Sequence, residues 1–83
     1  MGKVENRIAV ISIVVRDRTV TQNINDILSR HGDVILGRLG VPCPEHGVSI
    51  IVILINAENP VIGAIGGAIG NLPGVTIRSS MLI

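Results

Sequence analysis

The chain alternates between dense aliphatic runs and segments whose apolar residues recur at helical spacing. Residues 7–16 (RIAVISIVVR) are β-branched and aliphatic almost throughout, which is typical of a central β-strand. The next apolar positions fall on one face of a helix, and they are Val20, Ile24, Ile27, Leu28 and His31. Thr19 offers an N-cap hydroxyl for this helix, and Gly32 supplies a left-handed residue to end it.

A second strand is expected over residues 34–40, although two glycines weaken it. The following segment, residues 41–47, contains two prolines that cannot donate ladder hydrogen bonds, so we predict a turn-rich connection there. Residues 48–57 (VSIIVILINA) have the composition of a third strand.

The last third of the chain predicts a helix and a final strand. Asn59 and Pro60 are typical of an N-cap followed by the first helical residue, and the helix is expected to run to about Ile69. Pro73 and Gly74 then break the chain before a strand over residues 75–83.

The order strand-helix-strand-strand-helix-strand is that of the ferredoxin-like fold. We therefore predict an α+β sandwich of βαββαβ topology, with a four-stranded antiparallel sheet and two helices on one face. The length of 83 residues suits a single domain over residues 1–83 and leaves no room for a second core.

The two inner strands are aliphatic on both faces, which a sheet covered on one side does not need. In the first strand Ile8, Val10 and Val14 point one way, and residues 9, 11, 13 and 15 point the other. Helices cover only one of these faces, and an exposed aliphatic patch of that size normally marks an interface. We therefore expect a homodimer or homotetramer that uses the helix-free face, a sheet edge, or both.

Composition and charge limit the classes of partner and the cellular compartment that we expect for this chain. The net charge is +1 with basic residues scattered among acids, and the chain has no Phe, Tyr or Trp, so direct nucleic-acid binding is not expected. The longest apolar stretch is interrupted by Glu58, Asn59 and Pro60, which argues against a membrane span. A single cysteine, Cys43, excludes an internal disulfide and suits a reducing, cytoplasmic setting.

One cluster could bind an anion. Arg16 and Arg18 lie beside the N-terminus of the first predicted helix, where positive charge and backbone N–H groups favour a negative ligand, although solvated surface charge explains them as well. The candidate ligand contacts, expected between protomers, are Arg16, Asp17, Arg18, Thr19, Asn23 and Arg38.

A metal site is the alternative. Cys43 and His46 lie three residues apart, and a two-fold axis could assemble four ligands from two chains, whereas one protomer is two ligands short.

The glycines at 63, 66, 67 and 70 lack the G-x-G-x-x-G spacing of dinucleotide loops and are better explained by close helix packing. No acid, base and nucleophile converge, so we do not expect an enzyme.

Four segments carry a resemblance to a known family: residues 25–28 (NDIL), 35–42 (ILGRLGVP), 62–66 (IGAIG) and 72–79 (LPGVTIRS). They resemble the small iron-only hydrogenase system regulators, which have an ACT-like fold similar to the C-terminal domain of nickel-responsive repressors. The resemblance implies an oligomeric ACT-like regulatory module that acts on a hydrogenase system through a partner protein or a small effector. It names no cofactor.

The chain departs from these relatives at two places. The family commonly has a Thr-Gly-Lys run in the second helix, where this chain has Gly66, Gly67 and Ala68. The histidine and cysteine set that binds nickel in the repressors is not reproduced, so the resemblance does not extend to a nickel site.

Overall fold

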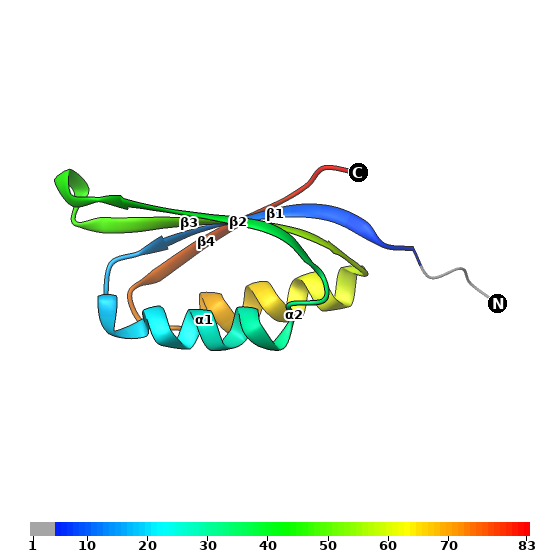
Figure 1. Cartoon of the computed structure of the whole chain (residues 1–83), viewed down its shortest axis with the longest axis horizontal. Helices are drawn as coiled ribbons and strands as arrows, with labels where there is room; N and C mark the ends of the chain where they lie inside the picture. Colours follow the sequence, from blue (N-terminus) through cyan, green and yellow to red (C-terminus); the bar gives the residue numbers. More distant parts are fainter. Residues whose placement is uncertain (1–4) are drawn as a thin grey trace.

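The computed structural model describes residues 5–83 and has the predicted ferredoxin-like architecture (Figure 1). Its strands are β1 (Arg7–Val15), β2 (Ile35–Cys43), β3 (Val48–Ala57) and β4 (Val75–Met81), its helices are α1 (Thr21–Arg30) and α2 (Asn59–Gly70), and two short 3₁₀ turns are η1 (Arg18–Val20) and η2 (Pro44–His46). The strands form one antiparallel sheet in the order β2-β3-β1-β4, and both helices lie on the same side of it.

The core lies between the sheet and the two helices. β1 and β3 are the inner strands, and their alternate residues, among them Ile11, Ile13, Ile53 and Ile55, are fully buried against the helices. The apolar stripe of α1 and the buried side of α2 cover them, with Ile24, Ile65 and Ile69 also at zero exposure. The aliphatic composition of the inner strands thus supplies one layer of the core, as β-branched residues pack well on a pleated surface.

The second strand is longer than the sequence predicts. We expected a connection over residues 41–47, but β2 continues through Val41 and Pro42 to Cys43, with Pro42 opposite Ser49 of β3. The expectation failed because β2 is an edge strand, where a proline can direct its missing N–H away from the ladder. The true connection is only η2 and Gly47, which has a left-handed φ of +66°.

Helix and strand ends also differ from the sequence predictions. Thr19 is not the N-cap: Asp17 caps η1 instead, and α1 follows without a side-chain cap. Gly32 does not take up a left-handed conformation, which among residues 5–83 is found only at Gly47 and Gly74. The cap of α2 is Glu58 rather than Asn59, and β4 ends at Met81.

The glycines of α2 divide into two pairs. A Cβ on Gly66 or Gly70 would lie 3.4 Å from the side chain of Ile77 in β4, at the near limit of ordinary van der Waals contact, so these two glycines lie where the helix packs on the sheet. Their position is consistent with the packing explanation. Gly63 and Gly67 are exposed and have open space where a Cβ would stand.

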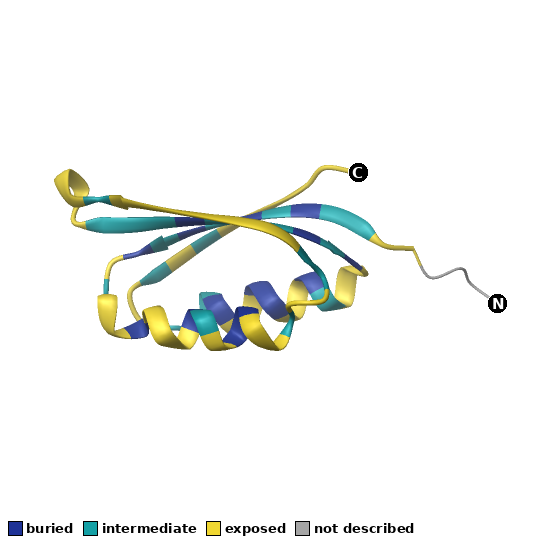
Figure 2. Ribbon diagram, in the orientation of Figure 1, coloured by how far each residue is buried: buried dark blue, intermediate teal, exposed yellow. Residues whose placement is uncertain are grey.

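The side of the sheet opposite the helices has no covering layer in the described chain (Figure 2). Its side chains on β1 and β3, which include Ile8, Val10, Val14, Ile50 and Val52, are half-buried by their neighbours alone. The inner strands therefore present aliphatic side chains on both sides of the sheet, as the sequence predicts. We call the side opposite the helices the open face.

Candidate functional site

Two adjoining hollows lie on the helix side of the sheet, between α1 with η1 and the edge strand β2. The larger has a volume of about 440 Å³ and the smaller about 250 Å³. Both are lined by Val15, Pro42 and Ser49, so they form one continuous depression. We call it the α1–β2 groove.

The groove exists because the helix layer does not extend over β2. Helix α2 packs on β4, β1 and β3, and α1 packs against α2, whereas β2 is held mainly by its ladder with β3. Gly40 lies on the groove wall and contributes no side chain to fill it. One hydrogen bond crosses the gap, from the Arg38 guanidinium to Asn25 Oδ1 at 2.9 Å.

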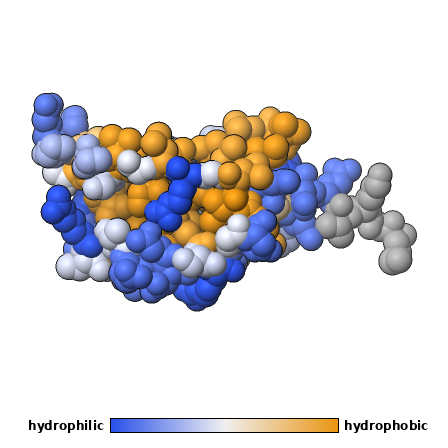
Figure 3. Space-filling view, viewed as in Figure 1, coloured by the Kyte–Doolittle hydropathy of each residue, from blue (hydrophilic) through white to orange (hydrophobic). Residues whose placement is uncertain are grey.

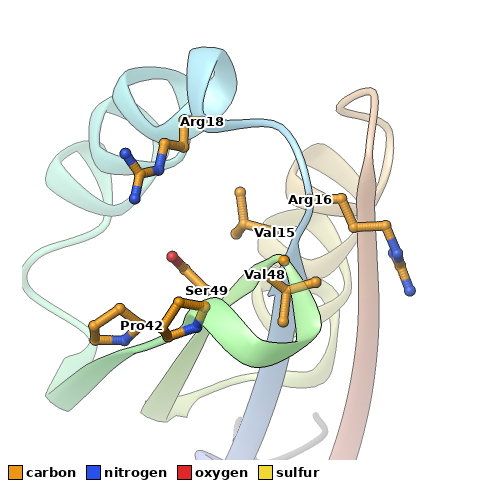
Figure 4. Close-up of a pocket in the computed structure, with 8 residues that line it drawn as sticks. Val15, Arg16, Arg18, Pro42, Val48 and Ser49 are labelled. Atoms are coloured by element: carbon orange, nitrogen blue, oxygen red, sulfur yellow. The ribbon is translucent and has the colours of Figure 1, made fainter.

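At the wide end of the groove, Arg18 and Ser49 face the same space (Figure 4). Arg18 extends from η1 above Pro42, and the Ser49 side chain points up from β3 toward it. Arg16 belongs to the same lining but is directed along β4, away from Arg18. Its Nη1 donates a hydrogen bond of 2.7 Å to Thr76 Oγ1, so of the two predicted arginines only Arg18 presents its charge to the groove.

Asp17 and Thr19 shape the turn that carries Arg18. The Asp17 carboxylate accepts hydrogen bonds from the Thr19 hydroxyl at 2.7 Å and from the Thr19 backbone N–H at 2.9 Å. These bonds favour the charged form and hold the pKa of the Asp17 carboxyl below its ordinary value. The turn also packs on Gly74, which has a left-handed φ of +70° and at which a Cβ would lie only 3.0 Å from Asp17 Cβ.

A lowered pKa in the folded state makes the stability of this turn depend on pH. The contribution of Asp17 is fully present above its ordinary pKa of 3.8 and is lost as pH falls through the lower folded value. We expect the wild-type protein to be more stable than Asp17→Asn at pH 7, with the difference shrinking as pH falls below 3.8. Urea unfolding of both proteins from pH 7 into the acid range measures it, and a difference that does not shrink as the carboxyl becomes protonated would contradict the assignment.

At the narrow end, the lining adds polar groups from both walls. Thr21 and Asn25 face the groove from α1, and Arg38 faces it from β2. Arg38 pairs in register with the buried Ile53, which places its side chain on the helix side of the sheet. The groove therefore has a guanidinium group in each of its two parts, and none of the described residues that line it is acidic.

The structure brings together only some of the residues expected from the sequence. Arg16, Arg18 and Arg38 line the groove, while Asp17 and Thr19 support it from the turn. Asn23 is exposed and lines neither part, and Asn25, which the sequence reasoning missed, takes its place. Helical periodicity sets Asn23 and Asn25 on opposite flanks of the apolar stripe of α1, so pattern alone leaves the choice between them open.

Cys43 is the last residue of β2, and His46 is the last residue of η2. Cys43 is half-buried, with Sγ 3.8 Å from the carbonyl oxygen of Val41, and His46 is exposed. Across residues 5–83 no three His, Cys, Asp or Glu side chains are grouped to hold a metal ion. A metal site here would need donor groups from a second chain.

Residues 7–79 match the family described as "TM1266-like: Iron-only hydrogenase system regulator, putative". The chain belongs to this family. The match spans all four strands and both helices except the last two residues of β4. No curated protein sequence matches significantly.

Solved structures have the same fold as this chain. The protein TM1266 from Thermotoga maritima is 30% identical over 95% of this chain and 100% of its own, with a TM-score of 0.89. An unknown protein from Galdieria sulphuraria is 17% identical, with a TM-score of 0.66, over 95% of this chain and 46% of its own.

The fold extends to a nitrogen regulatory PII-like protein, CPII from Thiomonas intermedia K12. Its apo form is 13% identical with a TM-score of 0.56, over 96% of this chain and 95% of its own. A second structure, bound to ADP, AMP and bicarbonate, is 17% identical with a TM-score of 0.51, over 96% of both chains. At these identities the likeness shows the ferredoxin-like fold alone. Within residues 5–83, neither α1 nor α2 has the length and hydrophobicity that a membrane-spanning helix requires.

Proposed function

We propose that this chain is a self-associating cytoplasmic regulatory module, not an enzyme, that binds a small anionic effector in the α1–β2 groove and acts on a partner of an iron-only hydrogenase system. The main support for a ligand site in the groove is the set of residues that line it. It combines the guanidinium groups of Arg18 and Arg38 with neutral donors and contains no carboxylate among the described residues.

The lining favours an anion that is small and elongated. Guanidinium groups bind carboxylate and phosphate oxygens through paired hydrogen bonds, and the hydroxyls of Ser49 and Thr21 and the amide of Asn25 add neutral contacts. The wide part alone falls within the range of about 300–1,000 Å³ that small-molecule sites occupy. A nucleotide or a carboxylic acid metabolite has both the charge and the size to fit.

Binding rather than catalysis suits the groove. Its hydroxyl groups, on Ser49 and Thr21, have no histidine or carboxylate beside them in the described lining to act as a base. The family is itself described as a regulator. These observations support a role in which occupancy, not chemistry, is the signal.

A bound effector would also couple two parts of the chain that otherwise touch little. Arg18 and Asn25 belong to the η1–α1 wall, and Ser49 and Arg38 belong to the β2–β3 wall. A ligand that contacts both walls would hold β2 against α1 and so stabilise one arrangement of the edge strand. A partner protein that contacts this edge would then sense the effector.

The experiment is a thermal-shift and calorimetric titration with phosphate, bicarbonate, AMP and ADP as probes. We expect at least one probe to raise the Tm of the wild-type protein by several degrees, since a ligand that binds only the folded state stabilises it. Arg18→Ala is expected to lose at least tenfold in affinity, because a charge-assisted hydrogen bond is removed.

Arg30→Ala is the matched control, because Arg30 is an exposed arginine of α1 whose side chain bonds the Asp26 carbonyl outside the groove. It should bind the probe as the wild type does. No stabilisation by any probe, or an equal loss in Arg18→Ala and Arg30→Ala, would contradict the groove as an effector site and leave a purely protein-binding role.

A further inference from the structure

The open face has an apolar side and a polar side. Antiparallel register aligns its side chains in rows across the sheet, from β2 through β3 and β1 to β4. One row is Leu39, Val52, Ser12 and Arg78, and the next is Val41, Ile50, Val14 and Thr76. A third runs from Leu54 and Val10 to Ser80.

Each row changes from aliphatic to polar side chains where it reaches β4. On β2, β3 and β1 they are almost entirely aliphatic, and on β4 each one ends in a hydroxyl or a guanidinium group. Leu39 and Val41 keep 60% and 43% of their surface exposed, although large aliphatic side chains usually avoid water. Figure 3 shows hydrophobic surface gathered over the sheet layer and hydrophilic surface over the helices.

We propose that a second copy of this chain covers the open face, with β3 of each copy at the two-fold axis and β4 of each copy left at the rim. The inference specifies the surface of the self-association named in the proposed function and does not depend on the groove. Residues of β2 would then face β1 of the partner subunit, and Arg78 would remain in water.

The area of the apolar part suits a second copy. Ten residues of β3 at about 3.3 Å each, across three strands spaced by about 4.8 Å, give a flat footprint of about 475 Å² per copy. Doubled over two copies and increased by the relief of the side chains, this reaches the roughly 1,000 Å² expected of a specific interface. Face-to-face packing of two sheets with aliphatic inner faces is a common arrangement.

The charge on Arg78 favours one orientation of the two copies. If the two copies placed β4 over β4, the like charges of Arg78 and of Arg78 of the partner subunit would be brought together, and the hydroxyl group of Ser80 would lose its contact with water. Shifting the axis to β3 removes β4 from the contact and keeps the aliphatic strands β2, β3 and β1 together. The polar strand then forms the solvated rim that interfaces usually have.

The first test is the mass of the full chain in solution. Light scattering at 100 µM is expected to give a dimer of the 8.7 kDa chain for the wild type and a monomer for Val52→Lys, with Ser80→Lys as the control that stays dimeric. Val52 lies at the middle of β3 on the open face, and Ser80 lies on β4 on the same face. Circular dichroism checks that each variant keeps its fold.

The second test does not require a destabilising substitution. In a Cys43→Ser background, Val52→Cys is expected to form a disulfide between copies on mild oxidation, because position 52 faces itself across the axis. Ser80→Cys is expected to stay reduced.

A native Val52→Lys that remains dimeric, or cross-linking at position 80 as complete as at position 52, would overturn the inference. A wild-type chain that is monomeric at 100 µM would overturn the inference and the self-association in the proposed function, and it would leave the effector titration unaffected.

Discussion

Replacing Ile11 with alanine is expected to lower the free energy of unfolding by about 3 kcal/mol, the largest effect of any single substitution considered for this chain. Ile11 is fully buried on the inner strand β1, between Ile53 of β3 and Ser79 of β4. Its Cδ1 would lie 3.8 Å from a Cβ placed on Gly66, so it fills the space where α2 meets the sheet.

The cost is high because the site cannot collapse. Ladder hydrogen bonds fix β1 on both sides, and Gly66 has no side chain that could move into the cavity. A chain of this size has a total stability of roughly 4–12 kcal/mol, so the loss is a large share of it.

Urea unfolding at equal protein concentration measures the difference, since self-association would otherwise shift the transition. Leu36→Ala is the control, because Leu36 keeps 56% of its surface exposed and its loss should cost less than about 0.5 kcal/mol. A destabilisation by Ile11→Ala no greater than that of Leu36→Ala would contradict the core described here.

The elements of the fold could be predicted from sequence where the pattern is long and unmixed. The runs of β1 and β3 and the stripe of α1 leave no alternative, and their order fixes the topology. The extent of β2 could not be predicted, because Pro42 is incompatible with an inner strand but acceptable at an edge, and position in the sheet is a tertiary property.

The candidate site was predictable as a region but not as a set of contacts. The sequence places Arg18 and Arg38 in segments that the fold brings together, and both line the groove. Asn23 was expected there and Asn25 was not, because the side of α1 that faces β2 depends on how the helix lies on the sheet. The direction of Arg16 depends on Thr76, which is 60 residues away along the chain.

The open face was predictable from β1 and β3, which are aliphatic on both sides. Its boundary was not, because only the register shows that Arg78, Thr76 and Ser80 close the apolar rows on one side while Leu39 and Val41 extend them on the other. The α1–β2 groove and the open face therefore lie on opposite sides of the sheet, and β2 contributes to both of them.

Filling the groove from β2 should separate effector binding from the rest of the molecule. Gly40 pairs in register with the buried Ile51, so a side chain at position 40 projects to the helix side, where nothing lies within 4 Å of its Cβ. Its φ is not in the left-handed region, so the backbone accepts a larger residue. We expect Gly40→Leu to fold normally and to bind the probe that stabilises the wild type at least tenfold more weakly.

The loss is expected to be at least as large as that of Arg18→Ala, because a leucine at position 40 excludes the ligand from the part of the groove that Arg38 and Asn25 line, whereas Arg18→Ala removes one contact. Gly67→Leu is the matched control: Gly67 is also exposed with open space at its Cβ, but it lies on α2. Calorimetric titration of both variants with the probe measures the two affinities. Wild-type affinity in Gly40→Leu would mean that an effector does not use the narrow part of the groove, and the coupling of β2 to α1 through the ligand would then have no basis.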